Sequence, residues 1–269
     1  MIKRLAILTI LPLAVLSISA SAIAAEQPEN GASQDAVQQE RPEQQPQAAS
    51  PDGAPAPARK LVRLARDYDL WVDLERRLVV VDGEICLREG MLEMFACPRG
   101  TKEHESIVSV NCRPKLVHAA LLAVGAQPGQ PVQFHPEYVG ASGTVVEVLV
   151  LWVDEDGQRH RARAQDWIKN VRTEKPMEHD WVFAGSGFWY CEHTEQQHYY
   201  ADGGDFICVA NFPSAMMDLP VKSPQDNADL LFTAFTERIP PLGTRVRLVL
   251  IPQLDQDSPA ATDQPAASD

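Results

Sequence analysis

Residues 104–125, "HESIVSVNCRPKLVHAALLAVG", place an apolar strand directly before a helix. Pro114 suits an early helical position, and Gly125 suits the residue after a helix end. Asn111 is a suitable N-cap residue because its side chain accepts a backbone hydrogen bond. The predicted helix covers about 113–124, and its expected apolar face consists of Leu116, Ala119, Ala120 and Ala123.

The rest of the pattern is rich in strands. "TVVEVLVLWV" (144–153) is the most apolar segment and is expected to lie centrally in a sheet. "TRVRLVLIP" (244–252) alternates in the way a strand does, and "RHRAR" (159–163) is typical of a solvated edge strand. These patterns predict the α+β class, a mostly antiparallel β-sheet with one principal helix (about 113–124) packed on it.

The two ends of the chain differ from this middle part. A short basic end precedes an apolar run that finishes in small residues, so we expect residues 1–24 to be a signal peptide cleaved after Ala24. Retention as an uncleaved anchor is the alternative. Residues 25–58 are expected to form a disordered Pro/Gln/Ala-rich linker, and residues 254–269 a disordered acidic tail. One exported domain, periplasmic or extracellular, then covers about 59–253.

The net charge of −13 lies mostly in the two tails. The linker and the C-terminal tail are both acidic, which leaves the folded region with a modest negative charge that is ordinary for a soluble protein. A nucleic-acid partner needs a basic face, so the composition disfavours one. The densest basic stretch, 159–163, is interpreted as a solvated strand edge.

Three segments together resemble the YdjY-like domain of exported bacterial proteins. They are "CLREGMLEMFACPRGTKEHESIVSVNCRPKLVHAALLAVGAQPG" (86–129), "DGGDFICVANFPSAMMDLP" (202–220) and "FTERIPPLGTRVRLVLIP" (235–252). The resemblance implies no settled activity, although some relatives are described as ferredoxin-like. This chain has scattered cysteines and no C-x-x-C, so we predict no iron–sulfur cluster and no other cofactor.

"KEHES" (102–106) is the first candidate for chemistry. If it begins a strand, Lys102, His104 and Ser106 share one face, and His104 is expected to face a shallow cleft beside the helix. A histidine there could act as a base or ligand, and a serine as a nucleophile. The catalytic candidates are therefore Lys102, His104, Glu105 and Ser106. The alternative, which we favour, is a structural polar end of a core strand.

A second candidate is the segment 190–200. Cys191 would share a strand face with His193, and a four-residue loop would place His193 opposite His198, so these three residues are candidates for a zinc site. Export also permits disulfides. The five cysteines leave at least one thiol unpaired and their pairing open: Cys86, Cys97, Cys112, Cys191 and Cys208.

Three functions compete. The sequence favours an exported, non-catalytic binding or interaction domain for an unknown protein or small-molecule ligand, with no nucleic-acid partner and no permanent membrane span after signal cleavage. The first alternative is an enzyme, hydrolase-like or metal-dependent, that uses the KEHES segment. The second is a redox or metal-handling protein that uses the scattered cysteines with His193 and His198.

Overall fold

The computed structural model describes residues 61–226 and 229–254. The predicted signal peptide (1–24), the predicted linker (25–58) and nearly all of the predicted tail lie outside these residues, so the structure does not test them. Within the described residues, no helix combines the length and the apolar character needed to cross a membrane.

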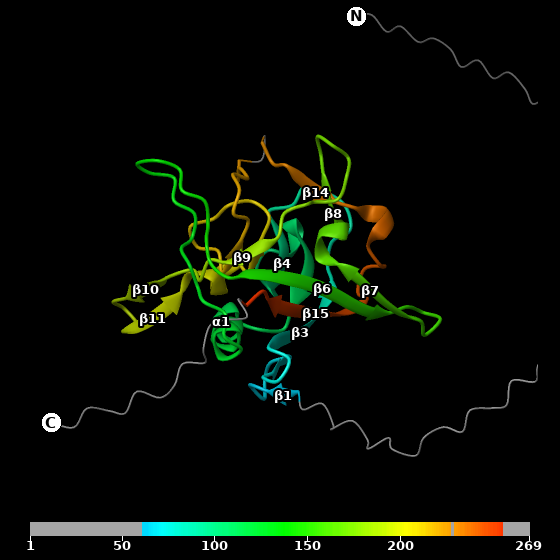
Figure 1. Cartoon of the computed structure of the whole chain (residues 1–269), viewed down its shortest axis with the longest axis horizontal. Coiled ribbons are helices and arrows are strands. Elements are labelled where there is room, and N and C mark those ends of the chain that lie inside the picture. The colour runs from blue at the N-terminus through cyan, green and yellow to red at the C-terminus, as the bar shows by residue number, and fades with distance from the viewer. Residues whose placement is uncertain (1–60, 227–228, 255–269) are drawn as a thin grey trace, which may run out of the picture. The chain divides into compact units, whose positions relative to one another are not determined.

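Eight strands of the described region form a closed barrel (Figure 1). In ring order they are β3 (Leu78–Ile85), β15 (Arg245–Pro252), β6 (Val145–Val153), β9 (Trp181–Phe183), β13 (Met217–Asp218), β12 (Ile207–Cys208), β4 (Met94–Pro98) and β5 (Ser106–Val110). The ring closes because β5 pairs with β4 on one side and with β3 on the other. Most neighbours are antiparallel, but β12–β13 and β4–β5 are parallel.

The other elements lie around this barrel. Two strands extend the sheet beyond β3, namely β2 (Leu70–Asp73) and then β1 (Val62–Arg63), and β7 (Arg159–Arg163) pairs with β6. Two small sheets join β8 (Ile168–Asn170) to β14 (Phe232–Ala234) and β10 (Phe188–Cys191) to β11 (Gln196–Tyr199). The helices are α1 (Pro114–Ala123) and four 3₁₀ turns: η1 (Glu103–Glu105), η2 (Ala164–Trp167), η3 (Tyr200–Gly203) and η4 (Thr236–Arg238).

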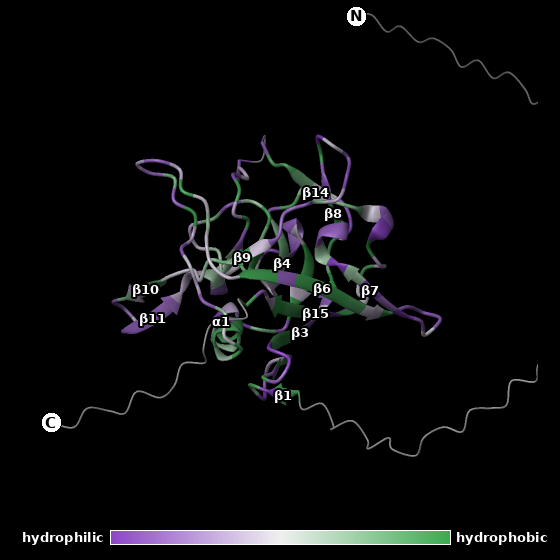
Figure 2. Cartoon of the chain, viewed as in Figure 1, coloured by the Kyte–Doolittle hydropathy of each residue, from purple (hydrophilic) through white to green (hydrophobic). Residues whose placement is uncertain are grey.

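The core follows from the alternation of side chains along the strands. On β3, Val79 and Val81 belong to the main core, while Val80 on the opposite face joins a separate, smaller apolar cluster. Hydrophobic residues accordingly dominate β3, β6 and β15 (Figure 2). Aromatic rings fill the barrel interior, where Phe95 lies 5.7 Å from Trp181 and 6.5 Å from Trp167 between ring centroids.

The α+β prediction was wrong, because the described chain is mostly β with a closed barrel. The expectation was a mostly antiparallel sheet with one principal helix (about 113–124) packed on it, and it did not include closure of the sheet into a barrel. The sequence shows neither the β3–β5 pairing nor the parallel β4–β5 pairing that together close the ring. A helix does form at Pro114–Ala123, but it is short and is not a principal layer of the fold.

The ends and the buried face of α1 differ in part from the prediction. Gly125 follows the helix with a φ of 98°, as expected of a helix end. The N-terminus, however, is capped from elsewhere in the chain, because Asp202 accepts a hydrogen bond from the Lys115 N–H at 3.0 Å. The buried face consists of Pro114, Val117, Ala120 and Leu121. Ala120 is common to the predicted and the observed face, Val117 and Leu121 are buried in addition, and Ala119 and Ala123 are exposed.

Candidate functional site

The KEHES segment begins as a tight turn and not as a strand. Glu103 to Glu105 form the 3₁₀ turn η1, and β5 starts only at Ser106. The alternation on which the shared face of Lys102, His104 and Ser106 depended was therefore wrong. A local bond explains the turn, since the Gly100 N–H donates to the Glu103 carboxylate.

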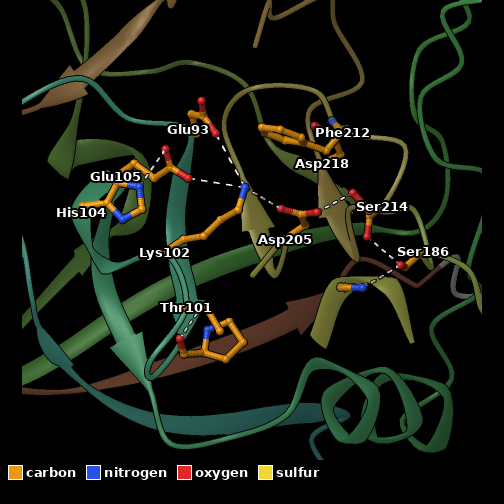
Figure 3. Close-up of polar contacts among 12 residues, drawn as sticks. Glu93, Thr101, Lys102, His104, Glu105, Ser186, Asp205, Phe212, Ser214 and Asp218 are labelled. Carbon is orange, nitrogen blue, oxygen red and sulfur yellow. Dashed lines mark hydrogen bonds and ion pairs between the residues drawn. The ribbon is translucent and has the colours of Figure 1, made fainter. Parts of the chain in front are cut away.

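Lys102 is the centre of an ion cluster (Figure 3). Its Nζ lies 3.0 Å from Asp205 Oδ1, 3.4 Å from Glu105 Oε1 and 3.7 Å from Glu93 Oε2. Glu93 directly precedes β4, Lys102 and Glu105 lie at η1, and Asp205 lies in the segment before β12, so the barrel brings together parts of the chain that are distant in sequence. We call these four residues the Lys102 cluster.

Contacts around the cluster hold it in place. The Phe212 ring lies 4.6 Å from the Lys102 ammonium, and Ser214 donates a hydrogen bond to Asp205. The aliphatic part of Lys102 packs so closely on Gly204 that a Cβ there would lie 2.6 Å from it. The side chain therefore has little freedom to swing towards another group.

The charges in the cluster shift the pKa values of its members. Burial alone would lower the pKa of Lys102, but Asp205, Glu105 and Glu93 outweigh it and raise that pKa. Burial, followed by repulsion from Glu105, raises the pKa of Glu93. A lysine held as an ammonium cannot act as a nucleophile or a base, so the geometry gives Lys102 an electrostatic role.

The other two candidates lie apart from this centre. His104 points away from it with 76% of its side chain exposed, and its Nε2 is 3.6 Å from Glu105 Oε2, beyond hydrogen-bond range. It does not face the cleft expected beside the helix. Ser106 is fully buried and lies beside the Cys97 thiol. Of the four candidates, the fold brings together Lys102 and Glu105.

We expect His104→Ala to change the free energy of unfolding by less than about 0.5 kcal/mol, because an exposed side chain with few contacts contributes little. A structural role for His104 would instead predict a clear loss of stability in this variant. Urea unfolding of the variant beside wild type measures it. His118→Ala is the matched control, since His118 bonds Tyr199 at 2.9 Å and packs on Phe183, and its loss should be clearly larger. Equal losses in both variants would contradict the exposed placement of His104.

Two of the cysteines interact. The neighbouring Cys86 thiol, with smaller effects from Ser106, Lys102 and Thr101, lowers the pKa of Cys97 to about 7 against the effect of burial. The proximity of Cys97 in turn raises the pKa of Cys86, whose thiol donates to the Ser106 carbonyl at 3.0 Å. Such a thiol is nucleophilic where reactants reach it, but Cys97 is completely buried. All five cysteines lie in the described region, and each has a free thiol.

The β10–β11 hairpin does not place its histidines as expected. Trp189, and not His193, pairs with His198, and the two rings stack at 4.6 Å. His193 lies in the turn between the strands, and Cys191 pairs with Gln196. Within the described residues, no group of three or more His, Cys, Asp or Glu side chains is arranged to hold a metal ion.

A pocket of about 930 Å³ lies elsewhere, on the sheet formed by β3, β15, β6 and β7. None of the four KEHES candidates lines it. Four arginines on two strands flank it, Arg245 and Arg247 on β15 and Arg159 and Arg161 on β7, with Leu151 and Val153 of β6 between them. We call these six residues the arginine face.

The strand register explains the arginine face. Leu151 pairs with Arg247 on one side and with Arg161 on the other, so the two arginines point from the same sheet face. Their backbones are two strand spacings apart, or about 10 Å. The sequence prediction treated 159–163 only as an edge. The sequence does contain a signal for the arginine face, because residues 159–161 and 245–247 share an Arg-x-Arg pattern. The strand order β15–β6–β7, which brings the two patterns together, cannot be derived from the sequence.

The carboxylates and the guanidinium groups at this pocket differ in whether they have a partner of opposite charge. The pocket's carboxylates are each paired: Asp82 with Arg247 at 2.6 Å, Glu84 with Arg99 at 3.2 Å, and Asp69 with Arg63 at 2.9 Å. His160 pairs with Asp154. Among the described residues, Arg159, Arg161 and Arg245 have no carboxylate partner. Three guanidinium groups are therefore available to an anion.

Comparison with known proteins gives one match. The family model described as the YdjY domain matches residues 70–251. No curated protein matches the chain, and no solved structure matches it. The matched residues include both the Lys102 cluster and the arginine face.

Proposed function

Since the chain belongs to the YdjY domain family, we propose that it is an exported binding domain without catalytic activity, and that it holds an anionic ligand on the arginine face. The single observation that carries this proposal is the imbalance of charge there. Every carboxylate that lines the pocket is already paired, while Arg159, Arg161 and Arg245 are not.

The chemistry of the face suits recognition. Guanidinium groups bind carboxylate, sulfate and phosphate through paired N–H donors, and they stay charged at all physiological pH values. The aliphatic strip of Leu151 and Val153 between the two pairs of arginines would contact the apolar part of a ligand. A pocket of about 930 Å³ has room for more than one anionic group.

The arrangement of the Lys102 cluster favours binding over catalysis. Its ammonium is matched by three carboxylates at 3.0 to 3.7 Å, and its members do not line the pocket. A lysine that acts as a base or a nucleophile would need a neutral form near pH 7, whereas these neighbours raise the pKa of Lys102. We assign the cluster to stability. The signal-like start and the long polar linker of the sequence support action after export.

We expect Arg159→Gln/Arg161→Gln to weaken the binding of polyanions at least tenfold, because it removes two charged donors from the pocket. Dextran sulfate, polygalacturonate and polyglutamate are the probes. Binding is followed by tryptophan fluorescence, since Trp152 lines the pocket and the Trp71 ring lies 5.2 Å from the Arg247 guanidinium.

The control variant, Arg172→Gln/Lys175→Gln, removes the same charge from an exposed turn after β8 that does not line the pocket. It should bind the probes within about twofold of wild type, because distant surface charges are screened by salt. Equal weakening by both double variants would mean that only net charge matters. That result, or no binding of any probe by wild type, would overturn the proposed function.

A further inference from the structure

β7 has a free edge beside the arginine face. It pairs with β6 along Arg159–Arg163, and no other strand of the described region pairs with it. Figure 1 shows β7 at the outside of the sheet. A free strand edge presents backbone N–H and C=O groups that another extended chain can bond.

The hairpin geometry shows which of these groups face outward. The Asp154 N–H donates to the Gln158 carbonyl at 3.0 Å, and bonded pairs alternate with non-bonded pairs along an antiparallel ladder. The bonded pairs nearest the turn are then Trp152–His160 and Val150–Ala162. Arg159 and Arg161 therefore direct their backbone groups away from β6.

Arg163 supports the same assignment independently. Its N–H lies 3.3 Å from Asp166 Oδ2, which accepts the bond, so it does not point to Leu149 of β6. The side chains of Arg159 and Arg161 meanwhile stand on the pocket side of the sheet, and both residues are exposed. One short strand thus combines free backbone groups with two unpaired guanidinium groups.

We propose that the ligand is an acidic peptide segment that adds to β7 as an extra strand and pairs alternate Asp or Glu side chains with Arg159 and Arg161. The inference rests on the proposed function and names its ligand. Side chains on one face of an extended peptide recur every two residues, at about 6.6 to 6.8 Å, which is also the period of Arg159 and Arg161. A polysaccharide has no backbone amides to continue the ladder.

The test compares two peptides of the same charge. One is a short, capped peptide in which glutamate alternates with threonine. The other has the same sequence with methyl groups on every second backbone nitrogen, on the edge that would face β7. We expect the methylated peptide to bind at least tenfold more weakly, because it loses ladder hydrogen bonds but keeps its carboxylates. We also expect Arg159→Gln/Arg161→Gln to weaken the unmodified peptide by a similar factor, and Arg172→Gln/Lys175→Gln to leave it within about twofold.

The outcomes separate this inference from the proposed function. Equal binding of the two peptides, or binding of dextran sulfate or polygalacturonate alone through Arg159 and Arg161, would overturn the strand addition and leave the anion site intact. Failure of every anionic probe would overturn both. In that case the arginines serve only to protect the edge from aggregation, as charged residues on edge strands commonly do.

Discussion

Replacing Lys102 with methionine should lower the free energy of unfolding by about 3 kcal/mol at neutral pH, as expected when one partner of a partly buried ion pair is removed. The variant leaves Glu93, Glu105 and Asp205 facing one another without a cation (Figure 3). Methionine retains most of the aliphatic packing on Gly204 and loses the ammonium, with its contact to the Phe212 ring, so the loss reports mainly on charge.

The pH dependence of this loss has a definite sign. The folded pKa of Lys102 is raised above the ordinary value of 10.5, so its contribution is fully present below that pH and is lost only as the pH rises through the folded pKa. In the variant, protonation of the carboxylates relieves their repulsion. The difference from wild type should therefore shrink as the pH falls towards about 4, the range in which carboxyl groups titrate.

Urea unfolding at several pH values measures this prediction. Lys175→Met is the control, because Lys175 is exposed and should change stability by less than about 0.5 kcal/mol. Adding Glu105→Gln to Lys102→Met should recover part of the loss, since it removes one of the three repelling charges. A Lys102→Met protein as stable as wild type at neutral pH would show that the cluster contributes nothing to folding.

Predictions from the sequence were correct for features that depend on neighbouring residues. They were wrong for features that depend on contacts with residues far along the chain. Pro114 and Gly125 gave nearly correct helix ends because both act locally. The capping Asp202 lies far along the chain, so no local pattern could identify it. The KEHES turn was missed for a different reason: a strand pattern was extended back through Lys102 without the Gly100 to Glu103 contact that forms η1.

The same distinction applies to the two candidate sites. Lys102 and Glu105 were named from the sequence, but their partners Glu93 and Asp205 come from the segments that precede β4 and β12. The arginines at 159–163 form a basic stretch in the sequence, which by itself indicated only a solvated strand edge. Their relation to Arg245 and Arg247 depends on β6 lying between β7 and β15, which is a property of the barrel order.

Asp218 should contribute up to about 4 kcal/mol of stability near pH 4, and this contribution should be lost as the pH rises to about 7. Asp218 is buried on β13, and burial raises its pKa from 3.8 to about 7. Hydrogen bonds from Asn211 at 3.0 Å and from the Leu219 N–H at 2.7 Å oppose that shift without cancelling it. The folded state therefore holds a proton that the unfolded state releases, so stability falls as the pH increases through this range.

The comparison of Asp218→Asn with wild type isolates this group, because the variant keeps the shape of the side chain but cannot titrate. The free energy of unfolding of wild type minus that of the variant should decline between about pH 4 and 7 and level off above. Asp67→Asn, at an exposed position, is the matched control for the same substitution. A level difference for Asp218→Asn would mean that the donors around the carboxylate keep it ionised. Phe212 donates its N–H to Asp218, and its ring lies beside the Lys102 ammonium. An ionised Asp218 would therefore add a fourth carboxylate to the three of the Lys102 cluster in this part of the fold.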